Sequence, residues 1–502
     1  MTPCRCKNET WWNNKVLSIV NCSDSDLQEV PDFSYLQSLK ITKLLLNKNN
    51  ISVLSDRSFN RVSVEEIDLS RNSIKTFENQ TLSHLSGHLK KLVLKWDEIP
   101  LDRGLYFLHG LKELEELSLD SNFIENDKQY LPGNLFANLG LASLKKLSLQ
   151  SCDIKNISAD AFIGLETLEE LDLRYNDLEE IPKAIFSLLN LKVLVLYGNN
   201  IIRLRNNTFI KLNKLEKLDL SANGISTIES GAFVGLEYSL KELLLHYTDL
   251  STVPTSALQR LEHLTSLVLS RNRIHFVPES AFKGLVNLEM LELDNNPLVY
   301  YKEMFSGLEN TLETLTIRGT GLTSLPKKSL MSLKKLSYLD VSFNNIGDLH
   351  DNALDGLNIK TIVLTNSNIT KISPRAFTGL KNPVGLDLDH NSISNISFIL
   401  EAEPCIFKYI DLTGNPVLCD CDTEKILNSG VIHYSLTGSC TLYTGSAYKL
   451  GSSLLISELN MLCNETTRMF WCHEAVQSHA VPKSELSSLT IFFIFINFVI
   501  SV

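Results

Sequence analysis

One eleven-residue pattern recurs along most of the chain and constrains its fold more than any other feature. The segments LEELSLDSNFI (114–124), LEELDLRYNDL (168–178) and LSYLDVSFNNI (336–346) share the form LxxLxLxxNxL. We count sixteen copies, from Leu39 to Phe407, spaced 23 to 25 residues apart except for one interval of 30. A fixed period near 24 residues is typical of a solenoid, so the length of 502 residues does not indicate separate globular domains.

The spacing of the leucines predicts one short strand in each repeat. Side chains alternate along a strand, so the two leucines of LxL share one face and enter a common core. A single repeat cannot bury that face alone, and stacking therefore pairs each strand in parallel with its neighbour. Many repeats continue with AFxGL, as at 161–165 and 376–380, which predicts a second apolar row on the convex side.

The asparagine of the pattern predicts a buried hydrogen-bonding ladder. Eleven of the sixteen positions hold Asn, and the exceptions are short side chains: Asp97, Cys152, Thr248, Thr320 and Ser367. A buried amide can satisfy the backbone groups that a sharp turn leaves unpaired. We therefore expect Cys152 to be a packed thiol inside the solenoid. A reactive or disulfide-bonded Cys152 is the alternative.

Over about residues 3–472 the chain resembles the extracellular leucine-rich-repeat superfamily in its typical 24-residue class. The resemblance implies an α/β fold: a right-handed, horseshoe-shaped solenoid of about sixteen repeats, with a parallel sheet on its concave face and a disulfide-stapled cap at each end. We expect an N-terminal cysteine cap at 1–33, the solenoid at 34–417 and a C-terminal cysteine cap at 418–472. A polar stalk at 473–488 and a hydrophobic tail at 489–502 would follow.

The resemblance also implies the pairing of the clustered cysteines. It predicts disulfides Cys4–Cys22, Cys419–Cys440 and Cys421–Cys463, while Cys405 and Cys472 form a candidate fourth pair. The family's first cysteine is missing, which leaves Cys6 without its usual partner, and no apolar leader follows Met1. Loss of an upstream segment would explain both; an atypical three-cysteine cap is the alternative. Zinc binding by the C-terminal cysteines is another reading, which an oxidising compartment disfavours.

Sequons and the apolar tail predict an extracellular, membrane-tethered protein. The sequence N-x-S/T occurs at Asn8, Asn21, Asn50, Asn79, Asn156, Asn206, Asn368, Asn395 and Asn464. Residues 489–502 form an apolar run shorter than the ~20 residues that a spanning helix needs. Small residues, a polar spacer and an apolar tail are typical of a glycosylphosphatidylinositol (GPI) signal, with attachment at Ser478. A short membrane span and a tail without a membrane role are the alternatives.

Charge and motifs exclude several function classes. The net charge is −11 with no basic stripe, so we expect no nucleic-acid partner. Motifs for nucleotide, metal or nucleophilic catalysis are missing from the sequence, and we predict no enzymatic activity and no cofactor. Carboxylates such as Glu115, Glu116, Glu169 and Glu170 recur because the repeat recurs, and we interpret them as solvated positions.

Function is therefore expected from a surface that binds another macromolecule. Aromatic and basic residues gather on the predicted strand face in repeats six to nine: Arg174, Tyr175, Tyr197, His246 and Tyr247. We predict a protein-binding patch here, with simple filling of the strand face as the alternative. The resemblance implies cell-surface adhesion or recognition, similar to GPI-linked proteins of the chaoptin and connectin type. The partner would be an extracellular protein or a second copy. A Toll-like receptor ectodomain and a secreted, Slit-like protein are the alternatives.

Overall fold

The computed structural model describes residues 4–10, 16–33, 40–60, 62–78, 81–301, 303–380, 382–403, 405–429, 436–443 and 445–462. Contacts divide the chain into two units, Met1–Leu315 and Thr316–Val502, and strand β20 (Thr314–Thr316) contains the boundary. Both units consist of stacked turns, and each turn contributes one strand to a parallel sheet. The predicted fold class, a leucine-filled solenoid with a parallel sheet and disulfides near both ends, is confirmed.

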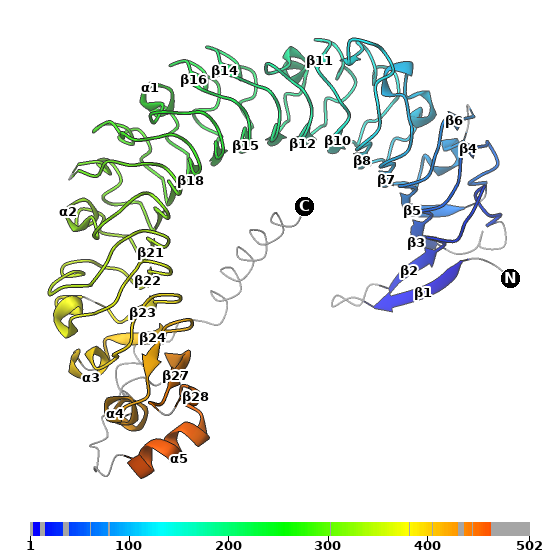
Figure 1. Ribbon diagram of the computed structural model, residues 1–502. Helices are drawn as coiled ribbons and strands as arrows, with labels where there is room; N and C mark the ends of the chain where they lie inside the picture. The colour runs from blue at the N-terminus through cyan, green and yellow to red at the C-terminus, as the bar shows by residue number, and fades with distance from the viewer. Residues whose placement is uncertain are drawn as a thin grey trace. The chain divides into compact units, whose positions relative to one another are not determined.

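The strands of unit 1 form a parallel sheet along the inner side of the turns (Figure 1). In β12, Leu171 pairs with Leu147 of β10 and Leu194 of β13, and all three side chains are buried. The same leucine-to-leucine register continues in the neighbouring turns because every repeat places its LxL at the same point. The strands are β2 (Val16–Asn21), β3 (Lys40–Leu45), β5 (Ser63–Asp68), β7 (Lys91–Val93), β8 (Glu116–Ser118), β10 (Lys146–Ser148), β12 (Glu170–Asp172), β13 (Val193–Val195), β15 (Lys217–Asp219), β17 (Glu242–Leu244), β18 (Ser266–Val268) and β19 (Met290–Glu292).

Short elements form the outer side of unit 1. They are strand pairs β4 (Val53–Leu54) with β6 (Thr76–Phe77), β9 (Tyr130–Leu131) with β11 (Asn156–Ile157), and β14 (Arg203–Leu204) with β16 (Thr227–Ile228), the helix α1 (Thr255–Leu258), and 3₁₀ turns η2 (Ser83–Leu85), η3 (Leu101–Arg103), η4 (Tyr106–Leu108) and η5 (Lys183–Ser187). The predicted phenylalanine row is present: Phe136 and Phe162 are fully buried with ring centroids 6.3 Å apart. Gly164 follows at φ +95°, and a Cβ there would lie 2.7 Å from the carbonyl oxygen of Phe136. The glycine of AFxGL thus lets adjacent turns approach closely.

A hairpin covers the first edge of the sheet. Strand β1 (Arg5–Thr10) pairs antiparallel with β2, which pairs in parallel with β3. A disulfide joins Cys4 to Cys22, the pair that the resemblance implied. The predicted start of the first repeat at Leu39 is wrong by two residues. The buried pattern begins at Ile41, because the interval from the first leucine to the asparagine is eight residues in every repeat and the first asparagine is Asn49.

Unit 2 repeats the same construction and ends in a small cap. Its parallel strands are β21 (Tyr338–Asp340), β22 (Thr361–Val363), β23 (Val384–Asp387), β24 (Phe407–Asp411) and β26 (Leu436–Thr437), with α2 (Lys327–Leu330), η6 (Pro374–Phe377) and α3 (Phe398–Glu401) on the outer side. The cap contains β25 (Val417–Leu418), β27 (Ser439–Thr441), β28 (Ala447–Lys449), α4 (Cys421–Ser429) and α5 (Ser453–Leu462). Cys419 is bonded to Cys440 as the resemblance implied, and Cys405 and Cys421 are also disulfide-bonded. The predicted partners Cys463 and Cys472 lie outside the described residues.

The buried asparagines form the predicted ladder. Asn176 Nδ2 donates to the carbonyl oxygens of Leu149 and Leu173, both at 2.9 Å, and its Oδ1 accepts from two backbone N–H groups of the preceding turn. One side chain therefore satisfies four backbone groups, each of which would cost about 1–3 kcal/mol if left unpaired. We call the residue at this position in each repeat the ladder residue.

Candidate functional site

The polar residues of the strand face of unit 1 are largely engaged with one another in the first six repeats. Glutamate and lysine alternate from repeat to repeat at the position six residues before the ladder residue. Lys43 pairs with Glu66 at 2.9 Å, Lys91 with Glu116 at 2.6 Å and Lys146 with Glu170 at 2.9 Å. The preceding position carries a second such row, in which Lys145 Nζ lies 3.0 Å from Glu115 and Lys192 Nζ lies 2.9 Å from Glu169. The four glutamates interpreted as solvated positions thus also hold ion pairs with neighbouring repeats.

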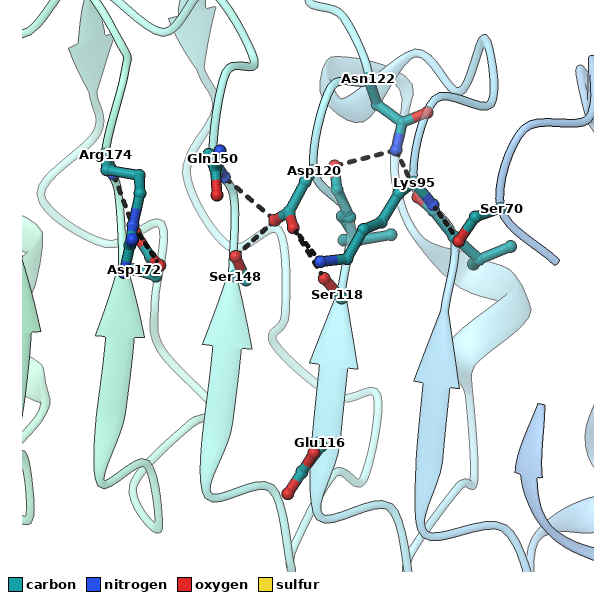
Figure 2. A network of polar contacts seen from close by, with 12 residues as sticks. Ser70, Lys95, Glu116, Ser118, Asp120, Asn122, Ser148, Gln150, Asp172 and Arg174 are labelled. Carbon is teal, nitrogen blue, oxygen red and sulfur yellow. Dashed lines mark hydrogen bonds and ion pairs between the residues drawn. The ribbon is translucent and has the colours of Figure 1, made fainter. Parts of the chain in front are cut away.

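Figure 2 shows a polar network around Asp120 on the same strand face, in which the polar groups bond to one another. Asp120 is buried, and its carboxylate accepts hydrogen bonds from Ser118 Oγ, Ser148 Oγ and the Gln150 N–H. Lys95 Nζ lies 2.7 Å from its Oδ2. Every acceptor position of this carboxylate is thereby used within the chain, and the network offers little to an incoming partner.

Where the predicted patch lies, Val193 interrupts the first ion-pair row, which resumes with Lys217 and Glu242 at 2.7 Å. Strand β13 has Val193 and Val195 at the outward positions, and β17 has Leu244 at one of them. The ring centroids of Tyr175 and Tyr197 are 5.2 Å apart in an edge-to-face arrangement, and those of Tyr197 and His246 are 5.8 Å apart. The structure therefore brings together side chains from three repeats. We call Tyr175, Tyr197, His246 and Tyr247, with Val193, Val195 and Leu244, the central patch.

The predicted residues differ in how available they are. Tyr175 and Tyr247 are 49% and 60% exposed, whereas Tyr197 and His246 are half-buried between them in sequence order. Arg174 is committed elsewhere, since its Nε lies 2.7 Å from Asp172 Oδ2 in the ion pair drawn in Figure 2. Ser221 holds the equivalent position in the repeat between those of Tyr197 and His246. Its side chain is small and fully buried, so the two rings contact each other across it. The tyrosines are the accessible part of the patch.

Burial sets the electrostatics of the central patch. It raises the pKa of the Tyr197 hydroxyl, and the neighbouring Tyr175 acts in the same direction. It also lowers the pKa of His246 below 6.5, with Arg271 acting in the same direction and Asp219 opposing it. His246 is therefore neutral at pH 7. The patch presents uncharged rings beside one carboxylate, Asp219, which sequence reasoning did not include.

The exposed tyrosines of the patch share a left-handed backbone conformation with the equivalent residues of the other repeats. The residue just before each ladder residue has positive φ: 56° at Tyr175 and 57° at Tyr247. Gly198, Gly319 and Gly414 occupy the same position in other repeats at little conformational cost. For a side-chain-bearing residue the left-handed conformation costs roughly 1–2 kcal/mol. The same conformation occurs at Lys48, Arg71 and Phe343, so it belongs to the repeat and does not distinguish the tyrosines of the patch.

One ladder residue of unit 1 lacks a hydrogen-bond partner on one side. Asp97 is fully buried; its Oδ1 accepts from the Asn72 N–H at 2.8 Å, but its Oδ2 has no partner within the described part of the chain. Burial raises the pKa of Asp97 from 3.8 to about 8, although the hydrogen bond from Asn72 lowers it.

Cys152, which also replaces asparagine at the ladder position, is a buried free thiol whose Sγ lies 3.4 Å from the carbonyl oxygens of Leu119 and Gln150. Burial raises its pKa to about 12, which makes it unreactive.

Six predicted glycosylation sites lie on exposed side chains: Asn21, Asn50, Asn156, Asn206, Asn368 and Asn395. The side chains of Asn8, Asn79 and Asn464, and the predicted attachment residue Ser478, lie outside the described residues.

Cys6 is an exposed free thiol. Within the described ranges, histidine, cysteine and carboxylate side chains form no group that could hold a metal ion, and none of the helices is long and apolar enough to cross a membrane.

Comparison with known proteins identifies the repeat. The pattern of the family described as "Leucine rich repeat" matches residues 40–99, 142–201, 189–238, 238–298, 310–360 and 358–417, more than half of the chain. The chain belongs to the leucine-rich-repeat family. Osteomodulin of Rattus norvegicus is 29% identical over 258 residues, covering 51% of this chain and 53% of osteomodulin. CD180 antigen of Mus musculus is 28% identical over 304 residues, covering 58% of this chain and 46% of the antigen. The aligned region thus spans about half of each relative.

Solved structures agree on the fold of this leucine-rich-repeat protein. A TLR13–ssRNA13 complex superposes with a TM-score of 0.61 at 24% identity, covering 85% of this chain and 62% of the other. The Drosophila Toll–Spätzle complex gives a TM-score of 0.57 at 18% identity, covering 88% and 74%. At this level of identity the similarity shows the solenoid alone.

Column-by-column comparison of the repeats could have revealed more of the site. Asp219 stands four residues before its ladder residue, in the same column as the apolar Val195 and Leu244 on either side. The alternating Glu and Lys columns are also visible once the repeats are aligned. The contact between the rings of Tyr197 and His246 across Ser221 could not be predicted from the sequence, because it depends on the curvature of the sheet and on the side-chain rotamers.

Proposed function

We propose that this leucine-rich-repeat protein is a non-enzymatic recognition protein that binds an extracellular protein ligand through the central patch. One observation carries the proposal: exposed tyrosines gather on the strand face around the half-buried, contacting rings of Tyr197 and His246. Tyrosine is favoured in protein interfaces because a large, rigid side chain combines apolar area with a polar tip. The Toll–Spätzle complex offers an analogy for a solenoid of this fold that binds a protein.

An extracellular location is part of the proposal. Disulfides close both ends of the solenoid, and disulfides persist mainly in oxidising compartments. Six sequon asparagines are exposed and could carry glycans. We further propose attachment to the outer leaflet by a GPI anchor at Ser478, with adhesion through a protein ligand or a second copy. A Toll-like receptor ectodomain and a secreted matrix protein remain the competing functions.

The binding proposal is tested with a soluble protein, residues 1–478 after a signal peptide, fused to an antibody Fc fragment. Staining of a cell panel is compared for the wild type, a Tyr175→Ala/Tyr197→Ala/Tyr247→Ala variant and a Lys91→Ala/Glu116→Ala/Lys146→Ala control on the same face. We expect the tyrosine variant to lose more than ~10-fold in staining, because anchors carry most binding energy. The control should stain like the wild type, and both variants should melt close to it.

Two results would reject the proposal: equal staining by the tyrosine variant, or no staining of any cell by the wild-type protein. Tethering is tested separately with the full chain displayed on cultured cells. Release by a phosphatidylinositol-specific phospholipase C supports the GPI anchor. Retention after treatment favours a membrane-spanning form, and appearance in the medium without treatment favours a secreted protein.

A further inference from the structure

The carboxylate of Asp219 lies at the central patch with one oxygen unused. Asp219 ends strand β15 and is half-buried. Its Oδ1 accepts a hydrogen bond from the Ser221 N–H at 3.0 Å, while its Oδ2 has no hydrogen-bond partner among the described residues. Its charge acts on Tyr197 and His246, the two half-buried rings of the patch. A negative charge therefore stands beside the rings with room for a donor.

At two other aspartates of this repeat position, Asp172 and Asp340, an arginine of the chain lies beside the carboxylate. Arg174, two residues after Asp172 in the same repeat, holds Asp172 at 2.7 Å. In unit 2, Arg318 of the preceding repeat approaches Asp340 Oδ2 at 3.7 Å, and its guanidinium carbon lies 5.2 Å from the ring centroid of Phe343. The chain thus shows how an arginine sits between a carboxylate and an aromatic ring on this surface.

At Asp219 both of these cation-bearing positions hold other residues. The same-repeat position is Ser221, and the preceding-repeat position is Tyr197. Nearby cations are engaged or distant: Lys217 pairs with Glu242 at 2.7 Å, and the ion pairs of the described chain include none between Arg271 and Asp219. Aromatic rings and a carboxylate remain without the cation that completes the arrangement at Asp340.

We propose that the partner completes the central patch with an arginine or lysine side chain, which packs against the tyrosine rings and donates to Asp219 Oδ2. This inference rests on the proposed function and specifies the chemistry of the ligand. Cation–π contact and a charge-assisted hydrogen bond would act together at one side chain. The net charge of −11 favours the approach of a basic partner over long range.

The test uses a phage-displayed library of random twelve-residue peptides. The library is selected on the immobilised soluble chain and counter-selected on the Tyr175→Ala/Tyr197→Ala/Tyr247→Ala variant, so that peptides bound to the patch remain. We expect these peptides to share an arginine or lysine, and Asp219→Asn to weaken their binding by ~10-fold or more. The substitution retains an oxygen for the Ser221 N–H, so the fold should be unaffected.

Asp68→Asn is the matched control. Asp68 also stands four residues before its ladder residue and accepts from the Ser70 N–H at 3.0 Å, but the neighbouring positions that hold Tyr197 and His246 beside Asp219 hold Asn47 and Lys95 here. This variant should bind as the wild type does. Replacing the shared arginine of a peptide by citrulline should weaken binding equally and remove the effect of Asp219→Asn, since the two groups act as one pair.

The outcomes separate the two proposals. Peptides that need the tyrosines but contain no shared cation, or that ignore Asp219→Asn, overturn the cation inference and leave the proposed function standing. A library whose binders are all removed by counter-selection, or that yields no binder, counts against the patch itself and against both proposals.

Discussion

The first six repeats and the central patch of unit 1 use the same repeat positions in opposite ways. In the first six, the outward columns alternate Glu and Lys, and Asp120 collects four donors from Lys95, Ser118, Ser148 and Gln150. In the central patch the ion-pair row is interrupted by Val193, the column of Lys95 and Gln150 holds Tyr197 and His246, and Asp219 keeps an oxygen unused. One surface is satisfied internally, and the other leaves groups for a partner.

The comparison shows that the position of a residue within its repeat, as well as the repeat in which it lies, decides whether it stabilises the fold or is available for binding. Ion pairs between neighbouring strands reward the correct stacking of repeats, although each exposed pair contributes only about 0–1 kcal/mol. The exposed rings of Tyr175 and Tyr247 do not contribute to the core in this way, so binding is the better explanation for them. We call the ion pairs and the Asp120 network of the first six repeats the closed region, and the central patch the open region. Substitutions in the closed region should change stability, and substitutions in the open region should change binding.

The largest effect is expected from Asp120→Ala in the closed region. Removal of this buried carboxylate leaves the Lys95 ammonium, the Ser148 hydroxyl and the Gln150 N–H without their shared acceptor. We expect the free energy of unfolding to fall by about 3 kcal/mol, because several donors lose their acceptor at once. Urea denaturation followed by circular dichroism measures the loss, and patch-dependent binding of the refolded protein should be retained.

Glu116→Ala provides the control in the same repeat. Glu116 makes an exposed ion pair with Lys91, so its removal should cost less than about 1 kcal/mol. Equal losses for the two variants would show that the Asp120 network is no more important than a surface pair. Loss of binding by Asp120→Ala in the folded state would erase the distinction between the two regions.

The solenoid and its ladder were predictable from the sequence because a period of 24 residues permits few alternatives. The leucines at LxL have one face to share, and Asn176 has only adjacent turns to bond. The aromatic members of the patch were also visible as Tyr175, Tyr197 and Tyr247. The roles of Arg174 and Asp219 could not be predicted, because the folded structure determines which neighbouring side chain reaches each carboxylate.

A smaller effect is expected from Asp97→Asn, at the ladder position of the third repeat in the closed region. By equivalence with Asn72 and Asn122, an amide here would donate to the carbonyl oxygens of Leu69 and Leu94. It would replace a buried Oδ2 that has no partner in the described chain. We expect a gain of about 1–3 kcal/mol in the free energy of unfolding at pH 8, measured by urea denaturation.

The pH dependence of this gain distinguishes its cause. The folded-state pKa of Asp97 is raised from 3.8 to about 8, so the folded chain binds the extra proton between those values. The contribution of this group to stability is complete below about pH 4 and is lost as pH rises towards 8. Asp97→Asn should therefore stabilise more at pH 8 than at pH 5. A gain independent of pH would show that Asp97 is not a protonated member of the ladder.

The smallest effect concerns His246 and sharpens the account of the open region. The groups around its ring are Tyr197, Tyr247, Asp219 and Arg271. Because burial holds its pKa below 6.5, the ring is neutral at pH 7.4 and becomes charged as the pH falls through that lowered value. A charged ring would repel the proposed arginine or lysine of the partner. Binding of a patch-dependent, cation-bearing peptide should weaken several-fold between pH 7.4 and 5, as measured by biolayer interferometry.

His246→Gln keeps a polar side chain of similar size without a charge in this range. It should bind the peptide nearly as well as the wild type at pH 7.4 and lose most of the acid weakening. Tighter binding of the peptide in acid would instead indicate an acidic contact on the ligand, and the open region would then select charge of the opposite sign.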